Sequence, residues 1–418
     1  MTHLLSVEQA VEQILTAIQP LPPRAVPLLQ AVGSILAEPV VAAESLPPFD
    51  NSGMDGYAVS SSDVKTARSD APVVLSVAMD LPAGSVPMRP LMPGQAARIM
   101  TGAPLPPGAD AVVPVEDTDS TWMNDASASL PEQVAIYMPA QPGANVRPAG
   151  HNVREGQQVL AVGVELRSPE IGMLAALGMR EVVVYPRPKV LILTSGDELV
   201  PYDGVVSTGQ IRDANSPALF AALLAAGAQP HILPIAKDTP EALRELYKQA
   251  VALQPDAIVS TAGVSVGAAD FTRQVLAEMG EVALWRINIR PGKPLAFGNI
   301  QGIPFFGLPG NPVSALVTFD VLVKPAIYHM SQRRLLEKFI TAQVTHDIHS
   351  DGRKSYLRVT LQQHHDRWLA TETGTQSSGA LMSLVLADGL LIVPENVRHV
   401  PAGAELPVKL WRDLPTEA

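Results

Sequence analysis

Hydroxyl and carboxylate residues follow directly after an apolar run that the sequence predicts to be a buried strand. The strand is Val190–Leu193, and the segment TSGDE occupies residues 194–198 behind it. Its hydroxyls and backbone amides could hold a phosphate, and its two carboxylates could hold a hard cation such as Mg²⁺. An ordinary polar turn has the same composition, so this segment alone leaves both interpretations open.

A second loop with comparable residues follows the predicted strand Ala257–Ser260. Gly263 allows the backbone to approach a ligand closely, and Ser265 supplies a hydroxyl. Asp270 lies near a predicted helix N-terminus, where a carboxylate serves equally well as a helix cap or as a metal ligand. The loop is neither a Walker motif nor a G-x-G-x-x-G fingerprint, so by itself it is a weak signal.

Three cations, Arg286, Arg290 and Lys293, fall within eight residues of the segment RINIRPGKP. Pro291 and Pro294 restrict the backbone and therefore the directions in which these charges point. In an acidic protein this segment is the most evident local site for an anion. A solvated basic loop is the alternative interpretation.

A turn rich in proline and glycine follows the predicted strand Phe305–Leu308 and opens a helix at Asn311-Pro312. The N-terminus of such a helix presents unpaired N–H groups to an anion. Ser314 lies in the first helical turn and adds a hydroxyl. Beside the basic segment, this turn is the second half of a predicted anion pocket, although alone it is an ordinary helix start.

Strands and helices alternate over residues 187–333, which predicts an αβα domain with a mostly parallel sheet. The carboxyl ends of parallel strands lie at one edge of a sheet, where ligands bind in such folds. The predicted strands are 190–193, 232–235, 257–260, 282–287 and 305–308, and predicted helices begin near residues 215, 239, 270 and 311.

The first part of the chain is expected to be a helical and linker region, residues 1–45 plus 146–186. Ser6 and Gln9 form a capping box at the start of a predicted helix over 6–18. Further helices are predicted over 27–38 and from Ser168.

Two β-rich regions complete a multidomain α/β architecture. Residues 46–145 contain short β-like runs separated by proline and glycine, which predicts an insertion that forms a separate lobe. Residues 334–418 contain five short predicted strands, which favour a small C-terminal β-barrel.

The composition excludes several classes of protein. The chain has 418 residues, 47% of them hydrophobic, enough for a sizeable core. It has no cysteine, which excludes disulfides, thiol nucleophiles and cysteine-ligated metal sites. The net charge of −11 argues against non-specific binding to nucleic acid or an anionic membrane. With no apolar run near the roughly 18–20 residues of a membrane span and no signal peptide, we expect a cytoplasmic protein.

Six motifs, taken in order, resemble the molybdopterin molybdenumtransferase (MoeA) family, which includes the E domain of gephyrin. They are PFDNSGMDGYAV at 48–59, RIMTGAP at 98–104, LTSGDEL at 193–199, AGVSVGAADF at 262–271, RPGKPLAFG at 290–298 and GLPGNPVSA at 307–315. No single motif is specific, but the ordered set covers nearly the whole chain.

The resemblance implies an elongated, four-part homodimer in which residues 187–333 form a MogA-like molybdopterin-binding domain, completed by the insertion of the partner subunit. It implies that adenylyl-molybdopterin reacts with molybdate to give molybdenum cofactor and AMP, with Mg²⁺ as cofactor. A MogA-type adenylyltransferase is an implied partner. The pterin dithiolene would supply the sulfur ligands, which agrees with a cysteine-free chain.

The resemblance also implies roles for particular residues. The implied catalytic residues are Asp55, Thr101, Glu198, Asp238 and Asp270. The implied metal ligands are Asp197, Glu198, Asp238 and Asp270. The implied substrate contacts are Thr194, Ser195, Gly196, Gly263, Ser265, Arg286, Arg290, Lys293, Pro309, Pro312, Ser314, Arg358 and Ser378. Of these, the molybdate-holding positions are Arg290, Lys293, Ser314, Arg358 and Ser378.

Two segments depart from the family pattern. Arg286 and Arg290 stand where the family commonly has lysine, and a guanidinium differs from an ammonium in geometry. The segment 143–152 carries His151 and Asn152 where the family usually has Glu-Asp. The loss of two carboxylates could weaken metal binding or change the pH dependence through His151.

Two other functions stay open beside that of a molybdenum insertase. One is a catalytically altered paralogue that acts as a pterin-binding or scaffold protein, since gephyrin also binds partner peptides. The other is a nucleotide phosphohydrolase on the αβα domain, which the lack of a Walker motif disfavours. Release of AMP that depends on molybdate would distinguish the insertase from both.

Overall fold

The computed structural model describes residues 4–121, 129–261 and 269–414, without the side chains of Ala269, Asp270 and Arg273. The chain divides into two compact units. Unit 1 comprises Met1–Ala37, Glu165–Arg167 and Val182–Ala418, and unit 2 comprises Glu38–Val164 and Ser168–Glu181. Each unit is described by itself, and the four domains expected from the sequence stay a prediction.

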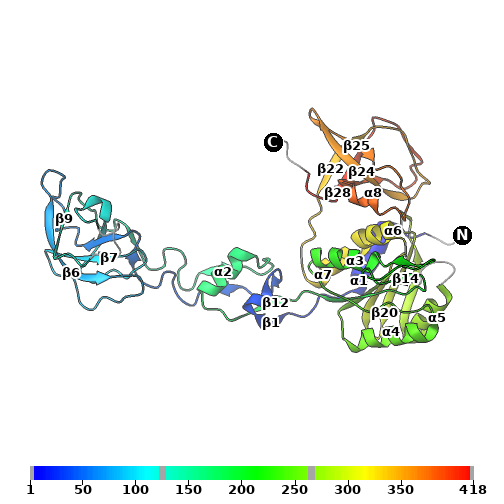
Figure 1. The fold of residues 1–418 in the computed structure, drawn as a ribbon, viewed down its shortest axis with the longest axis horizontal. Coiled ribbons are helices and arrows are strands. Elements are labelled where there is room, and N and C mark those ends of the chain that lie inside the picture. Colours follow the sequence, from blue (N-terminus) through cyan, green and yellow to red (C-terminus); the bar gives the residue numbers. More distant parts are fainter. Residues whose placement is uncertain (1–3, 122–128, 262–268, 415–418) are drawn as a thin grey trace. The chain divides into compact units, whose positions relative to one another are not determined.

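A six-stranded sheet forms the centre of unit 1 (Figure 1). Its strands, in spatial order, are β16 (Gln229–Ile232), β13 (Lys189–Leu193), β17 (Ala257–Ser260), β21 (Ile303–Gly307), β20 (Pro294–Ile300) and β18 (Gly280–Arg286). The first four are parallel, and β20 and β18 are antiparallel. This confirms the predicted mostly parallel sheet.

Helices cover both faces of this sheet, because successive side chains of a strand point to opposite faces. Val190 and Ile192 of β13 pack with α1 (Val7–Ala17), α3 (Asn215–Ala225), α6 (Pro312–Thr318) and α7 (Lys324–Met330). Leu191 and Leu193 pack on the other side with α4 (Pro240–Ala252) and α5 (Ala269–Met279). The result is the αβα sandwich expected from the alternating sequence.

Strand β20 was absent from the sequence-based expectation. It begins with a proline and contains Gly298 and Asn299, residues that strands disfavour. An added Cβ at Gly298 would lie 1.9 Å from the carbonyl oxygen of Glu281 on β18, so only glycine permits this close pairing. Long-range pairing on both sides therefore makes a strand of a segment whose local composition does not predict one.

The start of unit 1 confirms one predicted helix and corrects another. Ser6 and Gln9 form both bonds of the capping box at the start of α1. The helix predicted over 27–38 is wrong: the segment forms β1 (Arg24–Pro27), a 3₁₀ turn (Leu28–Ala31) and β2 (Ile35–Leu36). Gly33 has a φ of +72°, and β2 pairs with β12 (Glu181–Tyr185), so tertiary pairing overrides the helical pattern.

A closed ring of five strands forms the C-terminal barrel of unit 1. In ring order the strands are β24 (Lys354–His364), β25 (Arg367–Glu372), β22 (Phe339–Val344), β28 (Glu405–Leu410) and β26 (Gly389–Val393), which pairs with β24 again. This confirms the predicted barrel. Strand β19 (Ile289–Arg290) pairs with β24. The same region contains the antiparallel pair β23 (Ile348–His349) and β27 (His399–Val400) and the short helix α8 (Met382–Val385).

Unit 2 contains a five-stranded sheet, which agrees with the predicted β-rich insertion. In spatial order the strands are β8 (Ala111–Pro114), β5 (Gly56–Val59), β7 (Gln95–Ile99), β6 (Val73–Leu81) and β9 (Gln133–Ile136). The unit also holds α2 (Ser168–Ala176), a 3₁₀ turn (Val115–Asp117) and the short pairs β3 (Val40–Val41) with β11 (Gln158–Leu160) and β4 (Asn51–Ser52) with β10 (Val146–Arg147). Separate apolar clusters pack on the sheet residues Tyr57 and Val59 and on Ala58.

The helical stretch Pro312–Met330 has the length and mean hydropathy of a membrane-crossing helix. It runs from α6 through a π-helical turn, Phe319–Val323, into α7. This corrects the expectation that no apolar run of the chain approaches the length of a membrane span. Because 72% of it is buried inside the protein, it serves here as a core helix.

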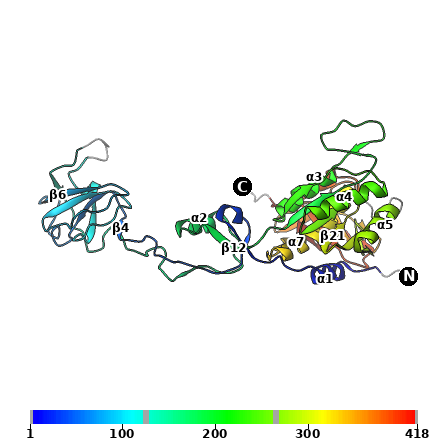
Figure 2. The same cartoon turned by 90° about the horizontal axis from the view of Figure 1, so that it is seen from below.

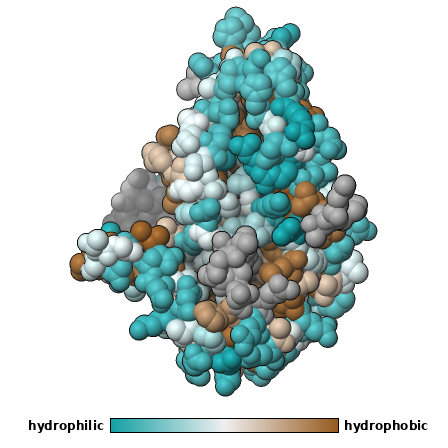
Figure 3. All heavy atoms as spheres, turned by 90° about the vertical axis from the view of Figure 1, so that its right-hand side faces the viewer, coloured by the Kyte–Doolittle hydropathy of each residue, from teal (hydrophilic) through white to brown (hydrophobic). Residues whose placement is uncertain are grey.

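The face drawn in Figure 3 is mainly hydrophilic, with hydrophobic residues in small groups.

Candidate functional site

Buried hydroxyls join the carboxyl ends of neighbouring parallel strands. Thr194, which follows β13, bonds through Oγ1 to Ser216 Oγ at 2.7 Å and to Thr261 Oγ1 at 2.9 Å. Thr194 is only 2% exposed. Its hydroxyl therefore connects these segments at the edge of the sheet, and its expected contact with the substrate stays a prediction.

Two of the predicted acidic residues, Asp197 and Asp238, are in contact at this edge. Ser195 Oγ donates to Asp238 Oδ1 at 2.7 Å, and the backbone N–H of Asp238 donates to Asp197 Oδ1 at 3.3 Å. Glu198 lines the neighbouring cavity, and an added Cβ at Gly196 would lie 3.0 Å from its Oε2. The sequence therefore brings Ser195–Glu198 and Asp238 together from two separate loops.

Carboxylate oxygens are ligands that Mg²⁺ prefers, but this edge of the sheet offers few of them. Within the described ranges, no group of three His, Cys, Asp or Glu side chains is placed to hold a metal ion. Mg²⁺ is usually held by one or two carboxylates together with phosphate oxygens and water. Asp197 and Asp238 are the carboxylates at this edge that could serve in that way. The side chain of Asp270, and the whole of Gly263 and Ser265, fall outside the described residues.

A cavity of about 470 Å³ opens at the carboxyl edge of the sheet. Six of the predicted residues line it, namely Ser195, Glu198, Lys293, Pro309, Pro312 and Ser314. The sequence analysis missed Arg212, Asp213 and Asn215, which also line it. Asp213 and Asn215 resemble an ordinary helix start, because Asp213 Oδ1 accepts the N–H groups of Asn215 and Ser216, both at 3.0 Å.

The basic segment turns back toward the sheet in a tight loop. The N–H of Ile287 donates to the carbonyl oxygen of Lys293 at 2.8 Å, which closes the loop. Gly292 has a φ of +101°, and an added Cβ would lie 2.2 Å from Thr318 Oγ1 of α6. Glycine is therefore required here, and the loop seats Lys293 at the cavity while β19 carries Arg290 to the barrel.

Arg358 of β24 is 1% exposed, the largest fully buried side chain of the described residues. Its Nε donates to Ser383 Oγ at 3.1 Å and its Nη2 donates to the carbonyl oxygen of Ser377 at 3.2 Å. Over the ranges that the structure describes, Arg358 forms no ion pair. Burial lowers the pKa of Arg358 to about 10, Glu372 opposes this shift, and Arg290 adds to it.

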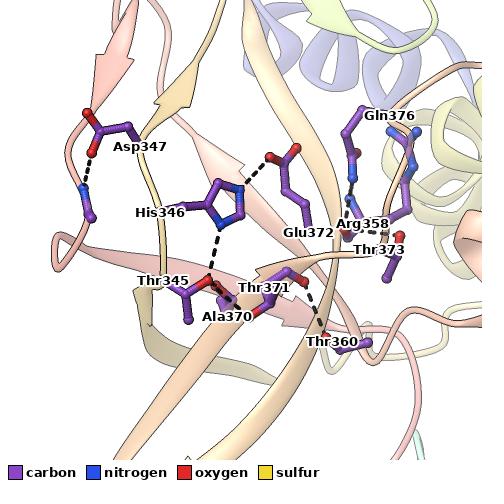
Figure 4. A network of polar contacts seen from close by, with 11 residues as sticks. Thr345, His346, Asp347, Arg358, Thr360, Ala370, Thr371, Glu372, Thr373 and Gln376 are labelled. Carbon is purple, nitrogen blue, oxygen red and sulfur yellow. Dashed lines mark hydrogen bonds and ion pairs between the residues drawn. The ribbon is translucent and has the colours of Figure 1, made fainter.

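The nearby carboxylate of Glu372 is directed elsewhere. Glu372 is paired with Val359 across the strands, and neighbouring residues of a strand point to opposite faces, so Glu372 and Arg358 lie on different faces. Figure 4 shows Glu372 turned toward His346, whose Nε2 lies 2.9 Å from Glu372 Oε2. Among the described residues, Glu372 therefore forms no hydrogen bond or ion pair with Arg358.

Ser378 connects this buried arginine with the proline-rich turn. Asn311 Nδ2 donates to Ser378 Oγ at 3.0 Å, and the N–H of Val313 in α6 donates to the carbonyl oxygen of Ser378 at 3.0 Å. One N–H group in the first turn of α6 is therefore bonded to the C-terminal region and is not available to a ligand. Because Ser377 bonds to Arg358, the structure joins Arg358, Ser378 and the turn at Asn311 in one chain of contacts.

In unit 2 the predicted pair Asp55 and Thr101 is in direct contact. Asp55 Oδ1 accepts the N–H of Thr101 at 2.7 Å and its hydroxyl at 2.8 Å. This carboxylate therefore orders the RIMTGAP loop.

His151 and Asn152, which depart from the family pattern, are both exposed.

Family models match three successive regions of the chain. They are the MoeA N-terminal region (domains I and II) over residues 5–178, a probable molybdopterin binding domain over 191–329, and the MoeA C-terminal region (domain IV) over 341–411. The second region coincides with the αβα sandwich and the third with the barrel.

Relatives and solved structures agree with these matches. Molybdopterin molybdenumtransferase 2 of Mycobacterium tuberculosis is 37% identical over 409 residues, which is 96% of this chain and 97% of the relative. Molybdopterin molybdenumtransferase of Haemophilus influenzae is 34% identical and covers 98% of this chain and 100% of the relative. The crystal structure of a molybdopterin biosynthesis MoeA protein from Pyrococcus horikosii is 34% identical, covers 99% of this chain and 100% of that chain, and superposes with a TM-score of 0.76.

The three regions follow one another in the family's order, and the relatives align from end to end. This chain therefore belongs to the molybdopterin molybdenumtransferase (MoeA) family, whose members are enzymes of molybdenum cofactor biosynthesis.

Proposed function

We propose that this chain is a molybdenum insertase, which converts adenylyl-molybdopterin and molybdate into molybdenum cofactor and AMP. The buried guanidinium of Arg358, which forms no ion pair with any residue that the structure describes, carries this proposal. A buried charge without a counter-ion is strongly unfavourable, so a protein retains one where a ligand supplies the opposite charge. Molybdate is a dianion and meets that need.

The neighbours of Arg358 suit an oxyanion. Arg290 adds a second guanidinium, as its effect on the pKa of Arg358 indicates, and Ser378 adds a hydroxyl. Lys293 and Ser314 line the adjoining cavity, whose size of about 470 Å³ is in the usual range for a small-molecule site. We assign molybdate to these five residues and the pterin nucleotide to the cavity, beside Pro309 and Pro312.

We assign the adenylyl phosphate to the loops after β13 and β16. Asp197, Glu198, Asp238 and Asp270 are the residues that would hold Mg²⁺. When bound, the ion would neutralise the phosphate at which the anhydride bond breaks. Ser195 orients Asp238 by its hydrogen bond, and Thr194 fixes the edge on which both loops rest. Arg286, Gly196, Gly263 and Ser265 are proposed as further contacts.

The insertion lobe is proposed to act in the same reaction. Asp55 orders the loop that carries Thr101, and we propose that this pair acts on substrate bound to a partner subunit in a homodimer. A MogA-type adenylyltransferase would supply the adenylylated pterin. The cytoplasm is the proposed location, in line with the absence of cysteine.

One observation favours the alternative, a pterin-binding or scaffold protein. A second cavity, of about 750 Å³ and mainly apolar, lies between α1 and the barrel and shares no lining residue with the proposed site. The insertase reaction makes no use of it. A protein that binds pterin nucleotide without turnover would fit this alternative.

The test is AMP release from adenylyl-molybdopterin by the purified protein with Mg²⁺, with and without molybdate. We expect release that depends on molybdate and is not supported by sulfate, a dianion that cannot accept the dithiolene sulfurs. Binding without release under any metal condition would reject the insertase in favour of the scaffold. Hydrolysis of ordinary nucleotides would favour a phosphohydrolase.

A further inference from the structure

Arg212 is a cation of the cavity wall that the assigned site does not use. It lies on β15 (Ile211–Arg212), which pairs in parallel with β14 (Leu199–Val200). The two strands close an excursion over residues 201–210, and this loop extends from the body in Figure 2. Arg212 lines the cavity together with Leu199 and Ile211 of the same stem.

The guanidinium is positioned but not neutralised. Arg212 Nε donates to the carbonyl oxygen of Gly204 at 3.1 Å, so the excursion fixes the side chain. Over the ranges described, neither of the cavity's carboxylates, Glu198 and Asp213, forms an ion pair with it. Asp213 instead accepts the N–H groups at the start of α3. The remaining N–H groups of Arg212 are therefore available to an anion.

Arg212 and Lys293 mark two separate positions along the cavity. Arg212 belongs to the chain that leaves β13, and Lys293 directly precedes β20. In the sheet, β17 and β21 lie between these two strands. The two cations thus reach the same cavity from different elements, Arg212 from β15 and Lys293 from the loop before β20.

We infer that Arg212 is a further substrate-binding residue, which binds the phosphate of the adenylyl group while Arg358, Arg290 and Lys293 bind molybdate. This inference rests on the proposed function. Arginine suits a phosphate because its planar fork donates two parallel hydrogen bonds, which a lysine cannot do. The bond that Arg212 Nε donates to the carbonyl oxygen of Gly204 sets the plane of that fork.

The test measures the affinities of AMP, adenosine and molybdate for the wild-type protein and for Arg212→Ala. We expect the variant to lose roughly tenfold to hundredfold in affinity for AMP. Its affinity for adenosine and for molybdate should equal that of the wild type. Arg212→Lys should lie between the two, because it keeps the charge without the fork. Arg334→Ala is the matched control, since Arg334 is exposed and lines none of the described cavities.

The outcomes separate this inference from the proposed function. Equal AMP affinity of Arg212→Ala and wild type overturns the inference alone, provided that the wild type still releases AMP with molybdate. An equal loss of adenosine affinity also overturns it, because the residue would then shape the cavity and not bind phosphate. A wild-type protein that binds neither AMP nor molybdate overturns both proposals.

Discussion

Arg98 of unit 2 and Arg358 of the barrel are both buried, at 8% and 1% exposure, but their surroundings are opposite. Asp80 Oδ1 accepts from Arg98 Nε at 2.8 Å and Asp80 Oδ2 lies 2.5 Å from Arg98 Nη2. This carboxylate raises the pKa of Arg98 above its usual value. Within the described part of the chain, the guanidinium of Arg358 bonds to neutral groups alone, and burial lowers its pKa to about 10.

The difference separates a structural arginine from a ligand-binding one. A buried ion pair is nearly neutral for stability, whereas an unpaired buried charge is costly until a counter-ion arrives. Arg98 follows the first pattern and belongs to the architecture of the insertion lobe, although it opens one of the six family motifs. Arg358 follows the second, because Glu372 on the adjacent strand β25 lies on the other face of the sheet.

Arg358→Met should give the largest effect. We expect molybdate-dependent AMP release to fall roughly hundredfold or more, because the dianion loses its buried partner. The temperature of thermal unfolding should stay equal or rise, since an apolar side chain of similar length replaces an unpaired charge. Kinetics and calorimetry on the same preparation check both. A folded variant with wild-type activity would break the comparison.

Arg98→Met should show the reverse behaviour. We expect unit 2 to lose about 1–3 kcal/mol of unfolding free energy, because Asp80, whose side chain is 38% exposed, keeps part of its solvation but loses its partner. Chemical denaturation followed by circular dichroism measures this loss. At temperatures where the variant is folded, its affinity for molybdate should match that of the wild type. A selective loss of molybdate binding would contradict the structural role.

Lys293→Ala sharpens the comparison within the site. Lys293 is exposed, so water screens its charge more than that of Arg358. We expect the KM for molybdate to rise roughly threefold to tenfold with kcat little changed. Steady-state kinetics at two salt concentrations check this, since the effect should shrink at high salt. A larger effect than that of Arg358→Met would reverse the proposed order of importance.

Asn152→Asp tests the departure in the insertion lobe. The position is exposed, so a restored carboxylate acts through water, and we expect AMP release to increase by at most about threefold. The double variant with His151→Glu should not go much further. A large gain in AMP release would mean that the wild-type chain is an impaired enzyme. That result would favour the scaffold function.

The affinity for molybdate should fall at alkaline pH. Arg358 is protonated below a pKa of about 10, so full affinity is present below that pH and is lost as the pH rises through it. Affinity should halve at about pH 10. Titration of Lys293→Ala removes the contribution of the lysine and should keep this inflection. An affinity that stays constant through this pH would contradict the assignment of the inflection to Arg358.

Local patterns in the sequence predicted much of the fold and the place of the site. The capping box of Ser6 and Gln9, the alternating strands after residue 187 and the barrel strands depend on neighbouring residues, and the structure has them. Strand β20 and the segment 27–38 depend on pairing with distant strands, which local composition does not reveal.

The residues of the site likewise fall into those that local sequence patterns predict and those that depend on tertiary packing. Loops that follow parallel strands must meet at one edge, so Ser195, Glu198 and Lys293 could be placed near a common cavity. The burial of Arg358 could not be foreseen, because it results from packing of the barrel against residues 377–383. Arg212 was missed because no local pattern marks an arginine beside a helix start as a ligand contact.

Binding of molybdate to the wild-type protein, Arg358→Met and Arg98→Met, measured by equilibrium dialysis with elemental analysis, tests the central claim most directly. The wild type and Arg98→Met should each bind one molybdate per chain, and Arg358→Met should bind none at the same concentration. Equal binding by Arg358→Met and the wild type would contradict the assignment of the unpaired arginine to the oxyanion.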